Sequence, residues 1–125
     1  MLQLFLGIAV AQAQPVHACI GDFIYRAGKD EVSVGARVRH GPDVAEISFS
    51  DYSRVGSTDL RWADGSLTII DPVDKSNLVL VCSAEGATLV LPKSEYSPAK
   101  SIVLKRTTGS LWEVGKREGW LKPEN

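Results

Sequence analysis

The sequence has few residues of the types that catalysis and metal binding most often use. Only two histidines and two cysteines occur among its 125 residues. It has no Gly-x-Ser-x-Gly, His-Glu-x-x-His or Cys-x-x-Cys motif and no phosphate-binding glycine loop. The two cysteines lie far apart and have no histidine pair near them, so a structural zinc site has no support. We therefore expect no enzyme, no metal and no cofactor.

The remaining candidates for a chemical site are weak. His40 is a possible general base beside Asp43 or Asp51, but the surrounding Arg-His-Gly-Pro-Asp has the composition of a turn. The acidic residues that gather in the middle of the chain are Asp59, Asp64, Asp71 and Asp74. Their spacing does not follow an EF-hand loop, which argues against calcium.

Charge of one sign is not in excess either. The formal net charge is -1, with 14 basic and 15 acidic residues, and none of them precedes Asp22. The last third of the chain is mildly basic, but it lacks the cluster of lysine and arginine that neutralises phosphates in nucleic-acid binders. We expect no nucleic-acid partner.

Residues 1–13 have the pattern of an export signal. An apolar run from Leu2 to Val10 is followed by Ala-Gln-Ala at 11–13, which fits the small-x-small site of signal peptidase. No Lys or Arg stands at the front, so a first strand or a buried helix remains the alternative. A transmembrane span needs about 18 apolar residues, and glutamines and a proline interrupt this run. We expect a periplasmic or secreted protein.

The two cysteines then predict a disulfide. In an exported chain an even cysteine count favours pairing, here of Cys19 with Cys82. The bond would close a loop of about 60 residues and stabilise by about 3 to 4 kcal/mol on the chain-entropy model. One alternative is a lipid anchor at Cys19, because the preceding residues 16–18 are loosely similar to a bacterial lipobox. Another is a buried free thiol at each position.

From residue 19 onward the dominant hydrophobic period is two. Apolar and polar residues alternate from Val32 to Arg39, and again from Ala45 to Ser50, as in strands with one buried and one wet face. The segment His40–Asp43 contains Gly and Pro and reads as the loop between them. These two strands therefore predict a hairpin.

Three further hairpins follow from turn signals at 64–65, 85–86 and 107–109. In each, one loop length brings large apolar residues opposite one another. The predicted pairs are Leu60 with Ile69 and Trp62 with Leu67, Leu80 with Leu91 and Cys82 with Leu89, and Ile102 with Val114 and Leu104 with Trp112.

A short strand at Asp22–Arg26 brings the total to about eight or nine. No segment shows helical periodicity longer than two turns. Sequential hairpins of this kind favour an all-β fold, a small antiparallel barrel or a sandwich. We assign residues 19–125 to one such domain after the signal segment.

Two surfaces are candidates for binding. Arg37 and Arg39 occupy alternate positions on a solvent face and form a basic ridge, which in the simpler interpretation only keeps the strand soluble. The hairpin from Leu78 to Leu91 is apolar on both faces, so its outer residues Val79, Val81 and Val90 need a cover. That cover is either intrachain or a partner protein.

Trp120 is the third candidate. It lies near the polar end of the chain and outside every predicted hairpin. Either it docks back over an open barrel end, together with Leu121 as a cover for the apolar hairpin, or it is an exposed anchor for a partner.

The composition and the expected architecture favour a small exported binding or inhibitory module for another protein or a cell-envelope component. In size and architecture the domain is similar to the small β-barrel inhibitors of hydrolases, although no residue motif identifies such a family. Two alternatives remain. One is a hydrolase or isomerase with a carboxylate-based site assembled from distant residues, and the other is a carrier with an apolar ligand in a large internal cavity.

The first prediction concerns the leader. We expect residues up to about Ala13 to be removed on export, because the uncharged apolar run ends in a signal-peptidase site. N-terminal sequencing of the mature protein checks this. Recovery of the chain from the cytoplasm with Met1 retained would contradict it.

Overall fold

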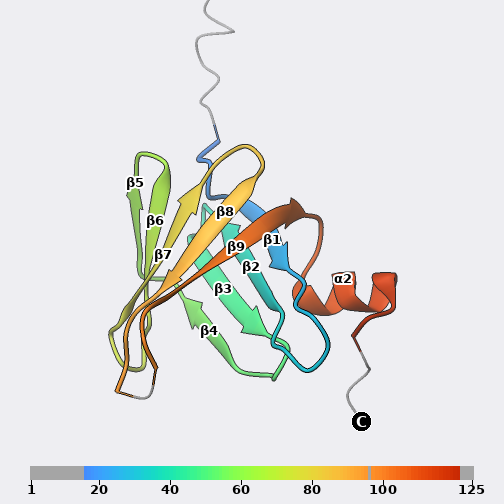
Figure 1. Cartoon of the computed structure of the whole chain (residues 1–125). Helices are drawn as coiled ribbons and strands as arrows, with labels where there is room; N and C mark the ends of the chain where they lie inside the picture. Colours follow the sequence, from blue (N-terminus) through green and yellow to red (C-terminus); the bar gives the residue numbers. More distant parts are fainter. Residues whose placement is uncertain (1–15, 96, 122–125) are drawn as a thin grey trace, which may run out of the picture.

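In the part of the chain that this computed structural model describes, nine antiparallel strands form a nearly closed barrel, and one short helix lies outside it (Figure 1). The structure describes residues 16–95 and 97–121, so the predicted signal segment 1–13 lies outside the described residues. The elements are β1 (Gly21–Tyr25), β2 (Val34–Arg39), β3 (Val44–Phe49), β4 (Arg54–Ser57), β5 (Leu60–Ala63), β6 (Ser66–Ile70), β7 (Asn77–Cys82), β8 (Gly86–Leu91), β9 (Lys100–Thr107) and α2 (Leu111–Glu118). The all-β prediction is confirmed, and the barrel is the correct alternative.

The barrel closes through β4 and β5, which are two parts of one bent strand. The sheet order β4-β3-β2-β1-β9-β8-β7-β6-β5 puts them at its two ends. Every neighbouring pair is antiparallel, so β4 and β5 run in the same direction, with only Thr58 and Asp59 between them. At the bend the Ser57 hydroxyl donates to the Ile70 carbonyl at 2.6 Å, and the Ile70 N–H donates to the Asp59 carbonyl at 3.0 Å. Because β4 and β5 join, the nine segments act as eight strands around the barrel.

The predicted registers are partly correct. The hairpin at 64–65 pairs Leu60 with Ile69 and Trp62 with Leu67, as expected. In the β7–β8 hairpin the prediction was wrong by two residues, since Leu80 pairs with Leu89. The turn is still a two-residue one, but it lies at 84–85 rather than 85–86, because the Ser83 N–H donates to the Gly86 carbonyl at 2.8 Å and Cys82 pairs with Ala87. A shift of two preserves the side-chain face, so the inward residues are still those predicted.

The last predicted strand is wrong, because residues 111–118 form the helix α2. Ser110 caps it: its hydroxyl accepts the Glu113 N–H, and the Glu113 carboxylate accepts the Ser110 N–H. Gly119 ends the helix in the left-handed conformation. This Ser-x-x-Glu capping box is a helix-start signal that the hairpin interpretation overlooked. Trp112 therefore does not face Leu104 in the barrel but stacks on Tyr52 at 5.0 Å.

One strand was also missed. The short β4 follows the turn after Phe49 and pairs with β3 from Ser48 to Ala45. Its sequence, Arg-Val-Gly-Ser, has one apolar side chain and too little alternation to indicate a strand. The expected number of strands was right only because this omission offset the false strand at 111–118.

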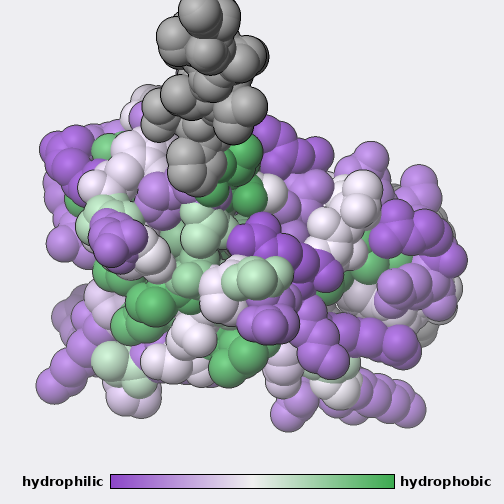
Figure 2. All heavy atoms as spheres, turned by 90° about the horizontal axis from the view of Figure 1, so that it is seen from above, coloured by the Kyte–Doolittle hydropathy of each residue, from purple (hydrophilic) through white to green (hydrophobic). Residues whose placement is uncertain are grey.

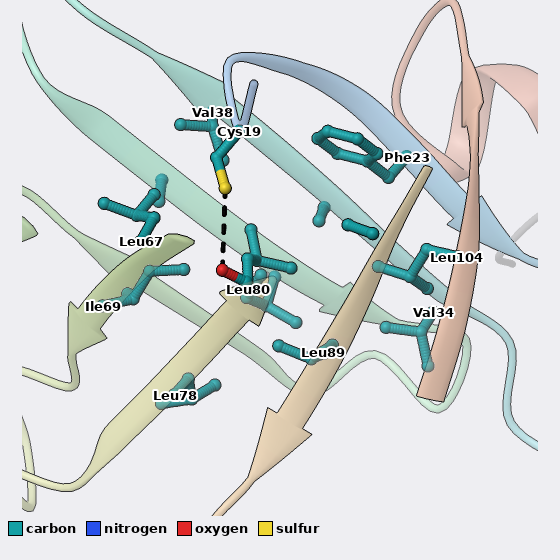
Figure 3. Close-up of a cluster of buried hydrophobic side chains, with 14 of the residues drawn as sticks. Cys19, Phe23, Val34, Val38, Leu67, Ile69, Leu78, Leu80, Leu89 and Leu104 are labelled. Atoms are coloured by element: carbon teal, nitrogen blue, oxygen red, sulfur yellow. Dashed lines mark hydrogen bonds between the residues drawn. The ribbon is translucent and has the colours of Figure 1, made fainter. Parts of the chain in front are cut away.

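Aliphatic side chains fill the barrel interior. Figure 3 shows residues from β1, β2, β6, β7, β8 and β9 converging on one another, and they include Phe23, Leu67, Leu80, Leu89 and Leu104, each at most 1% exposed. Burial of each large side chain contributes about 1.5 to 3 kcal/mol. These side chains form the hydrophobic core of the barrel.

The predicted Cys19–Cys82 disulfide is present, with a Cα separation of 5.3 Å. It joins the segment before β1 to the end of β7. The Cys19 sulfur is fully buried and lies 3.6 Å from the Leu80 carbonyl oxygen, the contact drawn in Figure 3. Neither cysteine is free. A bonded Cys19 sulfur cannot carry lipid, so the structure supports neither the lipid anchor nor two free thiols.

Arg106 fastens the same segment a second time. Its guanidinium donates to the carbonyls of Ala18 and Ile20 before β1, and also to those of Ser83 and Ala84 in the β7–β8 loop. A guanidinium has five N–H donors in a fixed fork, which is why one side chain can join two loops in this way. The disulfide and Arg106 therefore hold together the end of the barrel at which the chain enters, called the upper end below.

The helix α2 packs against β2 where that strand has no side chain. Leu111 and Val114 are buried, and a Cβ placed on Gly35 would lie 2.8 Å from the Leu111 Cβ. One helical turn after Leu111, Gly115 packs against Leu121, and a Cβ added there would lie 2.4 Å from the Leu121 Cβ. Glycine at these two positions lets the helix lie flat on the sheet and the tail lie flat on the helix.

Substitution of Gly35 tests this packing. We expect Gly35→Ala to lower the free energy of unfolding by about 1 to 3 kcal/mol, because the added methyl overlaps Leu111 and forces α2 away. Gly56→Ala on β4 is the matched control, since its Cβ would meet nothing within 4 Å. We expect it to change stability by less than about 0.5 kcal/mol. Urea unfolding followed by circular dichroism measures both, and equal effects would contradict the close approach of α2.

Candidate binding site

A hollow of about 870 Å³ opens at the lower mouth of the barrel, the end opposite the disulfide. Its floor is apolar and consists of inward-facing side chains at the lower ends of four strands. They are Val34 of β2, Phe49 of β3, Leu91 of β8 and Ile102 of β9. These side chains form the lowest layer of the filled core, and Val32, which the sequence placed inside, lies 41% exposed at the edge of the hollow.

Polar side chains surround this floor. They are Tyr25, Glu31, Asp51, Ser53, Lys100 and Ser101. Glu31 belongs to the β1–β2 loop and Asp51 to the β3–β4 loop. The two loops are tied together, because the Ser33 N–H donates to the Ser50 hydroxyl at 2.8 Å and the Ser50 N–H donates to the Ser33 carbonyl at 2.9 Å. Both carboxylates therefore stand on one wall of the mouth.

Both carboxylates are held by local hydrogen bonds. The Ser53 hydroxyl and the Ser53 N–H donate to Asp51 at 2.6 and 3.0 Å, and these bonds hold the pKa of Asp51 below its ordinary value of 3.8. Glu31 accepts the Gly28 N–H at 3.2 Å. Asp51 is thus a fixed negative charge at neutral pH.

Arg37 and Arg39 converge on Asp22 rather than facing solvent as a free ridge. Arg37 Nε lies 3.1 Å and Arg39 Nη2 lies 2.9 Å from the same carboxylate oxygen, and the Gly109 N–H donates to the other at 2.8 Å. Burial acts to raise the pKa of Asp22, but the hydrogen bonds from Gly109, Arg39 and Arg37 outweigh it, so the pKa lies below 3.8. This cluster joins β1, β2 and the loop before α2.

A shallower groove of about 560 Å³ runs along the outside of the barrel beside these arginines. Its floor is β3 and β4, with Gly56 leaving an open space. Glu46 lies on the same surface and pairs with Arg54 at 3.5 Å. Each arginine beside the groove has a carboxylate partner, since Arg39 pairs with Asp22, Arg37 with Asp22 and Glu113, and Arg54 with Glu46.

Val79, Val81 and Val90 lie together on the outer face of β7 and β8, as predicted. Val103 of β9 extends the face, since Thr88 pairs with both Val81 and Val103. Val81 is 52% and Val103 is 69% exposed, so the described part of the chain leaves this face largely open. The expectation that something covers it stays a prediction.

Trp120 lies apart from that face. Its indole N–H donates to Glu118 at 2.9 Å, and its ring lies 5.4 Å from the Arg26 guanidinium. The Trp120 N–H and the Leu121 N–H both donate to the Gly115 carbonyl at the end of α2. Leu121 therefore packs on the helix, and Trp120 lies beside Glu118 and Arg26 rather than over the apolar hairpin.

The tertiary structure also gathers three aromatic rings that the sequence did not connect. Trp62 of β5 lies between His17 and His40, with ring centroids 4.9 and 5.3 Å away. Asp43 accepts the Trp62 indole N–H at 2.8 Å and also contacts His40. That indole bond is the main cause that lowers the pKa of Asp43. The cluster bridges β5 and the β2–β3 loop at the upper end, where the two edges of the sheet diverge.

His17 is held in one tautomer. Its Nδ1 accepts the Cys19 N–H at 3.0 Å, so its Nε2 carries the hydrogen and donates to the Ala63 carbonyl at 2.7 Å. Of the two partners that the sequence offered His40, Asp43 contacts it and Asp51 lies at the opposite mouth. In the described ranges the hydrogen-bond partners of the two imidazoles are backbone groups of Ala63 and Cys19 and the Asp43 carboxylate, and no Ser, Thr or Cys side chain is among them.

Seen from above, the upper end has hydrophilic residues around its periphery and hydrophobic residues in separate patches (Figure 2). Within residues 16–95 and 97–121 there is no group of three or more His, Cys, Asp or Glu side chains placed to hold a metal ion. None of the helices in the described ranges is long and apolar enough to span a bilayer.

Comparison of the chain with protein-family models, with curated proteins and with solved structures found no match. The geometry of the sites above is therefore the basis for a functional assignment.

Asp22 yields a prediction on pH. A carboxyl whose pKa is lowered by folding adds stability above its unfolded pKa, and this stability is lost as the pH falls through the folded pKa. We expect Asp22→Asn to cost about 1 to 3 kcal/mol at neutral pH, and the difference from the parent chain to shrink below about pH 4.

Asp59→Asn is the matched control, because Asp59 also pairs with an arginine, Arg61, but is 48% exposed. Exposed pairs contribute about 0 to 1 kcal/mol. Urea unfolding at a series of pH values measures both variants. A pH-independent difference for Asp22→Asn would show that its charge is not what matters.

Proposed function

We propose that the chain is a small exported binding module and that the hollow at the lower mouth is its binding site. The observation that carries this is the combination of an apolar floor with a small number of fixed polar groups around it. Binding sites for small ligands have this composition, occur in the mouths of barrels and have volumes of about 300 to 1,000 Å³. The volume of about 870 Å³ falls within that range.

The disulfide supports the exported location. Disulfides persist in the periplasm and outside the cell and are rare in the cytosol. We therefore propose that the protein is periplasmic or secreted and that its ligand is another protein, or a part of one, or a component of the cell envelope.

A carboxylate-based enzyme is the second candidate, because Glu31 and Asp51 share one wall of the hollow. Acid catalysis at neutral pH needs a carboxyl whose pKa is raised by burial or by a like charge. Asp51 has the opposite property, since Ser53 lowers its pKa. The hollow is therefore better suited to bind a ligand than to transfer a proton.

A neutral apolar dye tests the proposal. We expect N-phenyl-1-naphthylamine to bind with a rise in fluorescence, and Val32→Trp to weaken binding at least about tenfold, because the indole fills the hollow from its edge. Val32 is 41% exposed, so the substitution does not disturb the core.

Val81→Lys is the control, because it changes the exposed outer face of β7 and leaves the mouth intact. We expect this variant to fold and to bind the dye as the parent chain does. If Val81→Lys rather than Val32→Trp abolished binding, the site would be the outer face and the mouth proposal would be wrong.

A further inference from the structure

The charges around the hollow are separated by sign. Glu31 and Asp51 stand on the wall that the β1–β2 and β3–β4 loops form, and Lys100 stands at the start of β9. In the sheet two strands lie between Lys100 and β3, which precedes the Asp51 loop, and one strand lies between Lys100 and β2, which follows the Glu31 loop, so the lysine and the carboxylates line different parts of the mouth. Figure 1 shows the two loops at the lower right and the start of β9 at the lower left.

Each of these charges has capacity for a ligand. Asp51 Oδ1 accepts both Ser53 bonds, and Glu31 Oε1 accepts the Gly28 bond. The second oxygen of each carboxylate and the Lys100 ammonium have no partner among the residues that the structure describes. The existing hydrogen bonds fix the orientation of the two carboxylates and leave one oxygen of each available to a ligand, as in a preorganised site.

We infer that the hollow binds a short apolar peptide with both ends free, its amino end at Glu31 and Asp51 and its carboxylate at Lys100. The peptide's aliphatic side chains then contact the floor of Val34, Phe49, Leu91 and Ile102. The hydroxyls of Tyr25 and Ser53 lie in the same lining and supply hydrogen bonds to its amide groups. This inference rests on the proposed binding function and specifies its ligand.

Other occupants fit the charges less well. A fatty acid or a single protein terminus carries one charge and leaves the charge of the other sign unpaired, and an unpaired charge is costly once water is displaced from it. A nucleic acid is repelled by two carboxylates. A neutral sugar uses neither charge and lacks the aliphatic surface for the floor.

Calorimetric titration with unmodified trileucine, N-acetyl-trileucine and trileucine amide tests the inference. We expect the unmodified peptide to bind about tenfold or more tightly than either blocked form, since each block removes one charge-assisted contact. We also expect Lys100→Met to weaken trileucine but not trileucine amide, and Glu31→Gln to weaken trileucine but not the N-acetyl form. If a substitution has no further effect once the ligand group is blocked, the substituted side chain and that ligand group contact each other directly.

Lys105→Met is the matched control. Lys105 lies on the same strand, is exposed and pairs with Ile24 away from the hollow. We expect it to bind all three peptides as the parent chain does. An equal effect of Lys105→Met and Lys100→Met would show a general charge effect and overturn the inference.

The remaining outcomes separate the two proposals. If the neutral dye binds in the mouth but the three peptides bind equally or not at all, the peptide inference is wrong and the binding function stands. If trileucine amide binds more weakly than trileucine but N-acetyl-trileucine binds equally well, the site recognises only the carboxyl terminus of a chain, and the inferred contact with a free amino end is wrong. If neither dye nor peptide binds, both proposals fail.

Discussion

The bend between β4 and β5 is the constraint on which the rest of the structure depends. A small antiparallel sheet that stays open exposes two edges of unpaired backbone groups. Here one strand pairs with β3 before the bend and with β6 after it, and Ser57 and Asp59 both hydrogen-bond to Ile70 at the junction. This near closure brings the inward faces of all strands together, which makes the filled hydrophobic interior.

The two ends of the barrel differ because, among the described residues, cross-links join segments across it only at the upper end. The Cys19–Cys82 bond and Arg106 draw the segment before β1 onto the β7–β8 loop, and Trp62 bridges the diverging edges of the sheet. At the lower end the loops around Glu31 and Asp51 bind each other but do not cross the mouth. The hollow results from this difference between the two ends. We therefore propose that ligands enter the hollow at the lower end of the barrel.

On the outside of the barrel, α2 packs closely against β2, and the valine face of β7 to β9 is exposed. Glycine at position 35 lets α2 lie on β2, and the Asp22 cluster fixes the loop that leads into the helix. The valines on β7 to β9 have no such cover in the described residues. An aliphatic outer face beside a polar mouth is compatible with a module that contacts a larger partner while it holds a small group in the hollow.

The sequence by itself determined the strands with strict alternation and the faces they bury, because side-chain period is a local property. It favoured the pairing of the two cysteines through their even count and the expected export, and the tertiary structure decided it by bringing Cys19 next to Cys82. The sequence did not by itself identify the helix α2, because residues 102–114 fit a hairpin pattern as well as the capping box at Ser110 and Glu113 fits a helix start. Only the tertiary structure decided which polar residues meet. Arg37 and Arg39 became partners of Asp22, and Trp120 came to lie beside Glu118 and Arg26. Glu31, Asp51 and Lys100, which no motif connects, came together because barrel closure brings the ends of distant strands to one mouth.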